Sequence, residues 1–98
     1  MTRPDASLIE PRFKESIDAF VATGRPTGGF LEAVLSNNLM ESIARADDAA
    51  LDNLPHIVAY LYNEVPGDCW GSSQRVREWK AQARTLDDAV ASSEGLLR

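Results

Sequence analysis

The segment Arg25-Pro26-Thr27-Gly28-Gly29 has the composition of a turn that can hold a phosphate group. Its two glycines let a ligand approach the backbone closely, and the apolar run that follows predicts a helix whose first N–H groups are unpaired. Arg25 and Thr27 add a guanidinium and a hydroxyl as donors. The segment lacks the Gly-Lys-Ser/Thr of a P-loop and follows a predicted helix rather than a strand. Phosphate binding and a plain interhelical turn with positive φ at glycine therefore both remain open.

A second group of donors lies near the end of the chain. Arg77, Lys80 and Arg84 follow one another at i, i+3 and i+7, with Arg75 close by, which predicts a basic stripe on one helix. Arginine contacts phosphates or an acidic partner well, but the same pattern is also typical of a solvated helix face.

Aromatic side chains supply the third part of a predicted ligand site. Tyr62, with Asn63 beside it, and Trp70 are expected at the surface, where a ring can stack on a base, whereas Trp79 is expected in the core. The complete predicted set of ligand-binding residues is Arg25, Thr27, Gly28, Gly29, Tyr62, Asn63, Trp70, Arg75, Arg77 and Lys80.

Catalytic and metal-binding patterns are not found in the sequence. The single histidine, His56, and the single cysteine, Cys69, are thirteen positions apart, which is not a zinc-ligand spacing. The serines lack the strand-turn-helix context of a nucleophile elbow. Cys69 precedes a predicted helix start that would favour its thiolate, or it is a small packing residue. We expect a protein without catalytic residues, metal or cofactor.

The acidic residues Asp47, Asp48 and Asp52 lack the glycine and terminal glutamate of an EF-hand loop, so they predict helix capping and a solvated face.

Composition limits the domain count and the classes of partner. The chain has 98 residues, 44% of them hydrophobic and 26% charged, which predicts one folded domain. Its net charge of -5 argues against coating a nucleic-acid backbone. A lone cysteine favours a reducing compartment, and no apolar run approaches the roughly 20 residues of a membrane span, so we expect a cytoplasmic protein. The small core favours self-association into an oligomer.

Apolar spacing predicts an all-α fold. Phe13, Ile17, Phe20 and Val21 share one face of a helix that Pro11 begins and Gly24 ends. The four-residue steps of Leu31, Leu35, Leu39 and Ile43 predict a second helical stretch after a Thr27 N-cap. Ser36-Asn37-Asn38 interrupts this stretch, so one helix and two helices are both possible.

The second half of the chain continues this helical pattern. An apolar face predicts a central helix after a cap at residues 46–48, and Pro55 either kinks it or marks its first turn. That face consists of Leu51, Leu54, Val58, Leu61 and Val65. Gly71-Ser72-Ser73 opens a last helix with a serine cap, and the inward side chains of this helix are Val76, Trp79 and Ala83.

We therefore predict a compact bundle of four to five helices with a single helical domain over 11–84. Residues 1–10 form a flexible N-terminal arm, from which Leu8 and Ile9 dock on the body. Residues 85–98 form a C-terminal tail, either a short helix or disordered.

Four segments carry a resemblance that covers roughly residues 12–80: Pro-Thr-Gly-Gly-Phe-Leu-Glu-Ala-Val-Leu-Ser-Asn at 26–37, Arg-Ala-Asp at 45–47, Tyr-Asn-Glu at 62–64 and Cys-Trp-Gly-Ser at 69–72. Together they resemble short accessory proteins of tailed bacteriophages and prophages. The resemblance implies a protein that acts in the bacterial cytoplasm, in a class that includes inhibitors of host defence, and it supplies no catalytic residues. By analogy, we expect an oligomer that sequesters a phosphorylated nucleotide signal. The alternative is a protein–protein interaction module that inhibits a host or phage protein.

Overall fold

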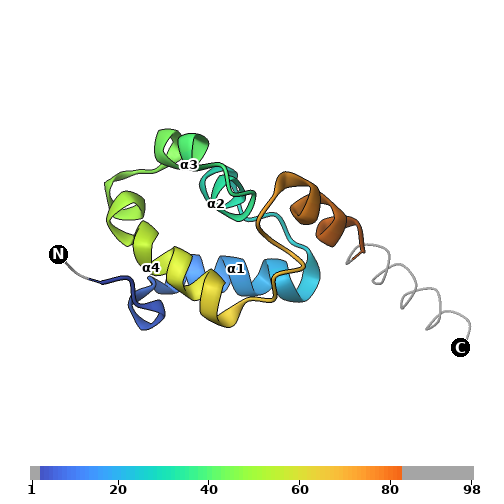
Figure 1. Cartoon of the computed structure of the whole chain (residues 1–98), viewed down its shortest axis with the longest axis horizontal. Coiled ribbons are helices and arrows are strands. Elements are labelled where there is room, and N and C mark those ends of the chain that lie inside the picture. Colours follow the sequence, from blue (N-terminus) through green and yellow to red (C-terminus); the bar gives the residue numbers. More distant parts are fainter. Residues whose placement is uncertain (1–2, 83–98) are drawn as a thin grey trace, which may run out of the picture.

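The computed structural model describes residues 3–82, and within this range the chain forms helices and no strands. Figure 1 shows α2 and α3 on one side of the molecule and α1 and α4 on the other, with the last helix beside α2. The elements are the short 3-10 helix η1 (Ala6–Leu8), α1 (Pro11–Thr23), α2 (Gly29–Leu35), α3 (Leu39–Arg45), α4 (Asp48–Glu64) and a last helix over 73–82. The predicted all-α class is confirmed.

Helix α1 has the limits and the buried face that its sequence predicts. Pro11 occupies the first turn, and Gly24 ends the helix with a φ of 73°, a left-handed conformation that favours glycine. Phe13, Ile17 and Phe20 are buried. The apolar face therefore packs into the core as predicted.

The stretch from Gly29 to Arg45 folds as two helices, which answers the question that the sequence left open. Asn37 has a φ of 60°, and the Asn38 side chain accepts a hydrogen bond from the Glu41 N–H at 3.2 Å, so the chain turns and caps a new helix here. Because of this turn, Leu39 and Ile43 are exposed while Leu35 is buried. The four-residue spacing therefore does not continue across the turn as one buried face.

Helix α2 begins one residue later than a Thr27 cap would require. Gly28 is the N-cap residue and has a φ of 95°, a conformation that residues with a Cβ rarely adopt. The Thr27 hydroxyl lies 3.5 Å from the Gly28 carbonyl oxygen and does not cap the helix. The prediction of Thr27 as N-cap is therefore wrong, because the glycine takes that position.

Helix α4 begins at its predicted cap, and its buried face differs from the predicted one at two positions. The Asp47 carboxylate accepts from the Ala50 N–H at 2.7 Å, and Pro55 lies inside the helix rather than in its first turn. Ile57 and Tyr60 are buried. The members of the predicted face are distributed as follows: Leu61 and Val65 are buried, Leu54 is half-buried, and Leu51 and Val58 are exposed. The predicted face is thus wrong at two positions, because a neighbouring row of side chains meets the core.

The segment from 3 to 10, assigned to an N-terminal arm above, lies against α4. Its anchor is Asn53, whose Nδ2 donates to the Leu8 carbonyl at 3.0 Å and whose Oδ1 accepts from the Glu10 N–H at 2.9 Å. The Asp5 N–H donates to Nδ1 of His56 at 3.1 Å. Ile9 is buried in the core beneath these contacts.

The last helix begins with the predicted serine cap and packs on α1. The Ser72 hydroxyl accepts from the Arg75 N–H at 3.1 Å, and Val76 is buried. The Trp79 indole N–H donates to the carbonyls of Phe20 and Val21, both at 3.2 Å. The predictions for Ala83, Arg84 and the tail 85–98 lie outside the described residues. None of the helices between residues 3 and 82 is long and apolar enough to cross a membrane.

Candidate functional site

The turn before α2 borders a hollow of about 270 Å³. Thr27, Gly28 and Gly29, three of the predicted ligand-binding residues, line it together with Phe13 and Phe30. The two phenylalanine rings lie with their centroids 5.7 Å apart, which gives the hollow an aromatic wall beside the backbone of the turn. This arrangement can receive a ring-bearing small molecule.

Arg12 lines the same hollow, and the sequence did not predict it as a site residue. Its guanidinium carbon lies 4.3 Å from the centroid of the Phe13 ring, a cation–π distance. Arg12 also pairs with Glu10 at 3.0 Å and with Asp47 at 3.6 Å. The hydrogen bond to Glu10 holds the Arg12 pKa above its usual value. The charge of this arginine is therefore already balanced by two carboxylates.

A second guanidinium lies over the start of α2. A Cβ built on Gly29 would lie 2.9 Å from Nη1 of Arg45, so the glycine leaves space for that side chain. Arg45 pairs with Glu41 at 2.9 Å. Arg25, the charge predicted for this site, is exposed in the loop and does not line the hollow. The turn thus has cations nearby but little unpaired positive charge with which to attract phosphate.

Two of the predicted donors on the last helix bind groups within the chain. Nη1 of Arg75 donates to the carbonyls of Gly67 at 3.3 Å and Trp70 at 3.4 Å, and it thereby supports the turn before the helix. Nζ of Lys80 pairs with Glu32 at 2.8 Å and ties the last helix to α2. Arg77 is exposed. Two positions of the predicted basic stripe, Arg75 and Lys80, therefore bind groups within the chain.

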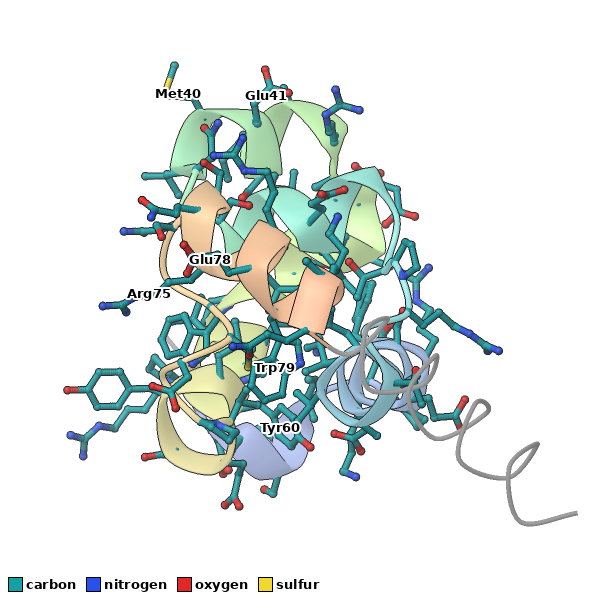
Figure 2. The ribbon with its side chains drawn as sticks, turned by 90° about the vertical axis from the view of Figure 1, so that its right-hand side faces the viewer. Met40, Glu41, Tyr60, Arg75, Glu78 and Trp79 are labelled. Carbon is teal, nitrogen blue, oxygen red and sulfur yellow. The ribbon has the colours of Figure 1, made fainter. Side chains whose placement is uncertain are left out.

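Arg75 lines a separate hollow of about 590 Å³ between the 67–68 turn and the last helix. Figure 2 shows Arg75, Glu78 and Trp79 along this helix. The carboxylates of Asp68 and Glu78 share the hollow with the Arg75 guanidinium, so its lining has mixed charge. No residue of the turn before α2 lines this hollow, so the predicted ligand residues do not form one site.

The predicted stacking residues differ in accessibility. Trp70 is half-buried, and its indole N–H donates to the Val65 carbonyl at 3.3 Å. Tyr62 and Asn63 are exposed near the end of α4, and neither residue lines the two hollows above.

Cys69 has the environment of a packing residue. Its side chain is fully buried, and burial raises the pKa of the thiol. Its Sγ–H donates to the Pro66 carbonyl at 3.2 Å. The protonated thiol is therefore favoured. Between residues 3 and 82, no three His, Cys, Asp or Glu side chains gather as they would around a metal ion.

Helix α3 carries a surface that the sequence did not predict, which we call the α3 outer face: Leu39, Met40, Ile43 and Ala44. These positions lie on one side of a helix because they are spaced one, three and four residues apart. Leu39 is 67% exposed, Met40 82% and Ile43 45%. Met40 projects from the edge of the molecule in Figure 2. The four-residue spacing placed Leu39 and Ile43 on one helical stretch, and spacing alone does not say whether that face is buried or exposed.

The charged side chains of α3 are Arg45 and Glu41, and Figure 2 shows Glu41 at the same outer edge as Met40. Glu41 and Arg45 pair with each other, and they line a hollow with Gly29 and Glu32 of α2. The four side chains that define the α3 outer face are themselves apolar.

Comparison of the chain with protein-family models, with curated protein sequences and with solved structures finds no match in any of the three. Functional inference therefore depends on the surfaces described above.

Proposed function

We propose that this protein is a non-enzymatic interaction module that binds another protein chain through the α3 outer face. The observation that carries the proposal is the exposure of Leu39 and Met40, two large apolar neighbours at 67% and 82%. Apolar side chains that gather at an exposed position of a soluble protein mark interaction surfaces, because covering them releases the water that they order.

The scaffold supports this role because it fixes α3 without burying its apolar side chains. Ser42 is the buried residue of α3, and its hydroxyl donates to the Asn38 carbonyl at 2.7 Å. The Asn38 cap and the Glu41–Arg45 pair stabilise a helix of seven residues, which would be marginal in isolation. A helix held in this way presents its outer face to a partner at a small cost in conformational entropy.

The resemblance to phage accessory proteins supplies the biological setting of the proposal. The class that this resemblance implies includes inhibitors of host defence. An uncharged apolar face suits this role, since a partner covers it without having to desolvate unpaired charges. The expected location of the protein is the bacterial cytoplasm.

Site-specific photo-crosslinking in the producing cell tests the proposal. A photoreactive amino acid at position 40 should give one discrete protein adduct, and the same amino acid at exposed position 77 on the last helix should give none. Leu39→Lys in the same chain should abolish the adduct from position 40. Equal adducts from both positions, or none from position 40, would contradict a binding role for α3.

Sequestration of a phosphorylated nucleotide is the second candidate, favoured by the hollow beside the turn before α2. Its lining joins Thr27 and the Gly28-Gly29 backbone, which can contact a phosphate, to an aromatic wall that can stack on a base. A phosphate would have to draw Arg12 from its pairs with Glu10 and Asp47. Calorimetry with cyclic nucleotides and ADP-ribose derivatives should then show binding that Arg12→Ala weakens and Arg77→Ala leaves unchanged. Absence of heat and of thermal stabilisation across these compounds would reject the candidate.

A further inference from the structure

We propose that Met40 is a site of reversible oxidation by peroxides, and that its conversion to the sulfoxide weakens binding at the α3 outer face. This inference rests on the proposed function, because it names the regulation of the same face. Two properties of the chain support it. One is the accessibility of this sulfur atom, and the other is the apolar surface on which a sulfoxide would lie.

Met40 carries the accessible sulfur atom of residues 3–82. Its side chain is 82% exposed, whereas Cys69, the other sulfur-bearing residue in this range, is fully buried. Burial raises the pKa of the Cys69 thiol, and its Sγ–H donates to the Pro66 carbonyl at 3.2 Å, so the thiolate that peroxides oxidise is disfavoured. A thioether reacts without losing a proton, so its exposure decides its reactivity. Peroxide should therefore oxidise Met40 before Cys69.

The oxidation of Met40 needs a peroxide and no other group of the protein. The thioether sulfur attacks one oxygen of hydrogen peroxide, the O–O bond breaks and a sulfur–oxygen bond forms. Sulfur loses two electrons to the peroxide, whose second oxygen leaves as water. Methionine sulfoxide reductases reverse the change: a dithiol is oxidised to a disulfide, and the sulfoxide oxygen leaves as water. The modification can therefore be made and removed.

The surroundings of Met40 make the added oxygen unfavourable in a covered surface. Leu39, its neighbour on the α3 outer face, is 67% exposed, and Ile43 lies on the next turn of the same face. The sulfoxide oxygen accepts hydrogen bonds from water, and these apolar side chains offer no donor to replace them. Glu41 lies at the same outer edge (Figure 2), but its carboxylate is also an acceptor. Covering the oxidised face should therefore cost more than covering the reduced one.

Peroxide treatment of the folded full chain, followed by mass spectrometry of tryptic peptides, tests the site of oxidation. The peptide with Met40 should gain one oxygen, while the peptide with Cys69 should stay unmodified until the chain is unfolded in urea. A separate peptide that ends at Arg3 reports on Met1. The midpoint of thermal unfolding should not change, because the Met40 side chain lies largely in water. A folded chain in which Met40 is oxidised no faster than Cys69 would overturn the inference.

Crosslinking from a second position of the face tests the regulation. A photoreactive amino acid at position 43 leaves Met40 in place. The purified chain is treated with hydrogen peroxide, freed of it by catalase and mixed with lysate of the producing cell. The adduct should decrease about tenfold, since an unpartnered polar group must be buried, and methionine sulfoxide reductase should restore it.

Two variants of Met40 serve as matched controls in this experiment. Met40→Leu keeps an apolar side chain without sulfur, so its adduct from position 43 should be insensitive to peroxide. Met40→Gln places a polar side chain of similar length on the face, so its adduct should be weak even without peroxide. A loss of adduct in Met40→Leu as large as in the wild type would place the effect at another residue and contradict the role of Met40.

The outcomes separate this inference from the proposed function. An adduct from position 43 that stays unchanged when Met40 carries the added oxygen overturns the regulation and leaves α3 as a protein-binding helix. Absence of adducts from positions 40 and 43 in the untreated chain rejects the proposed function, and the regulation with it.

Discussion

Helices α2 and α3 each have seven residues and follow one another in the chain, yet their apolar side chains have opposite environments. Four residues of α2 are buried, whereas Ser42 alone is buried in α3. The turn at 36–38 produces this difference, because it redirects the chain before Leu39. Apolar spacing thus identifies the residues that share a face of a helix, and the turn decides whether that face meets the core.

The largest expected difference between the two helices is the cost of removing a leucine. Leu35→Ala should lower the free energy of unfolding by about 2–5 kcal/mol, because Leu35 is 1% exposed and its loss leaves a cavity. Leu39→Ala should cost about 0.5 kcal/mol or less in the monomer, because the side chain is largely in water. Urea denaturation at low protein concentration measures both. Equal costs would show that α3 is packed like α2.

The conformation of Asn37 gives the next largest effect. Asn37→Ala should destabilise the protein by about 1 kcal/mol, since an alanine at a φ of 60° meets the steric penalty of the left-handed region. Asn37→Gly should be neutral or stabilising, since glycine adopts this conformation without strain. Thermal unfolding of the two variants supplies the comparison. An alanine variant as stable as the glycine variant would argue against a fixed turn between α2 and α3.

The cap of α3 has a comparable but more local effect. Asn38→Ala removes the acceptor for the Glu41 N–H and should cost about 1 kcal/mol. Asn38→Ser retains a capping oxygen and should recover most of that loss. Amide hydrogen exchange should show faster exchange in α3 of the alanine variant and little change in α2. Faster exchange in both helices would mean that they unfold as one unit.

The contact between α1 and α4 predicts that the free energy of unfolding depends slightly on pH. Helix α3 should not contribute to this dependence. Partial burial acts to raise the Asp18 pKa, but hydrogen bonds from Tyr60 and Lys14 outweigh it, so the pKa lies below its usual value. A lowered pKa in the folded state stabilises the protein above the unfolded pKa, and this contribution is lost as the pH falls below about 4.

Tyr60 accounts for a loss of stability at alkaline pH. Burial, followed by the hydrogen bond to Asp18, raises the Tyr60 pKa, so its stabilising contribution is complete below about pH 10 and is lost as the pH rises further. Tyr60→Phe should therefore reduce both the acid and the alkaline losses in unfolding experiments. Met40→Lys should leave the acid limb unchanged. An acid limb equally steep in the Tyr60→Phe variant would contradict the assigned hydrogen bond.

Local signals in the sequence predicted the all-α class and several helix ends. Pro11, Gly24, Asp47 and Ser72 act on backbone groups within three or four residues of themselves, so their effect is visible in the order of residues alone. Asn37 and Asn38 belong to the same group, and they indicated the interruption without deciding whether the helix breaks.

Other features depend on contacts between distant residues, and sequence spacing did not identify them. Arg12 reaches the hollow beside α2 because α1 packs there, and Lys80 is engaged because Glu32 lies across from it. On helix α4, contacts with neighbouring elements bury Ile57 and Tyr60 in addition to Leu61. Leu51 and Val58 of the predicted face stay exposed. For the hollow beside the turn before α2, the sequence predicted only the lining residues 27–29, which are neighbours in the chain.

Asn53 holds the segment around residues 8–10 against α4, so the release of this segment can report local opening of the fold. A single buried amide supplies both the donor and the acceptor that hold residues 8 and 10, and a carboxylate at that position would lack the donor. If these two hydrogen bonds break together, we expect Ile9 to leave the core and the first turn of α1 to open to trypsin at Arg12. Limited proteolysis at Arg12 would therefore follow the opening of this segment separately from global unfolding.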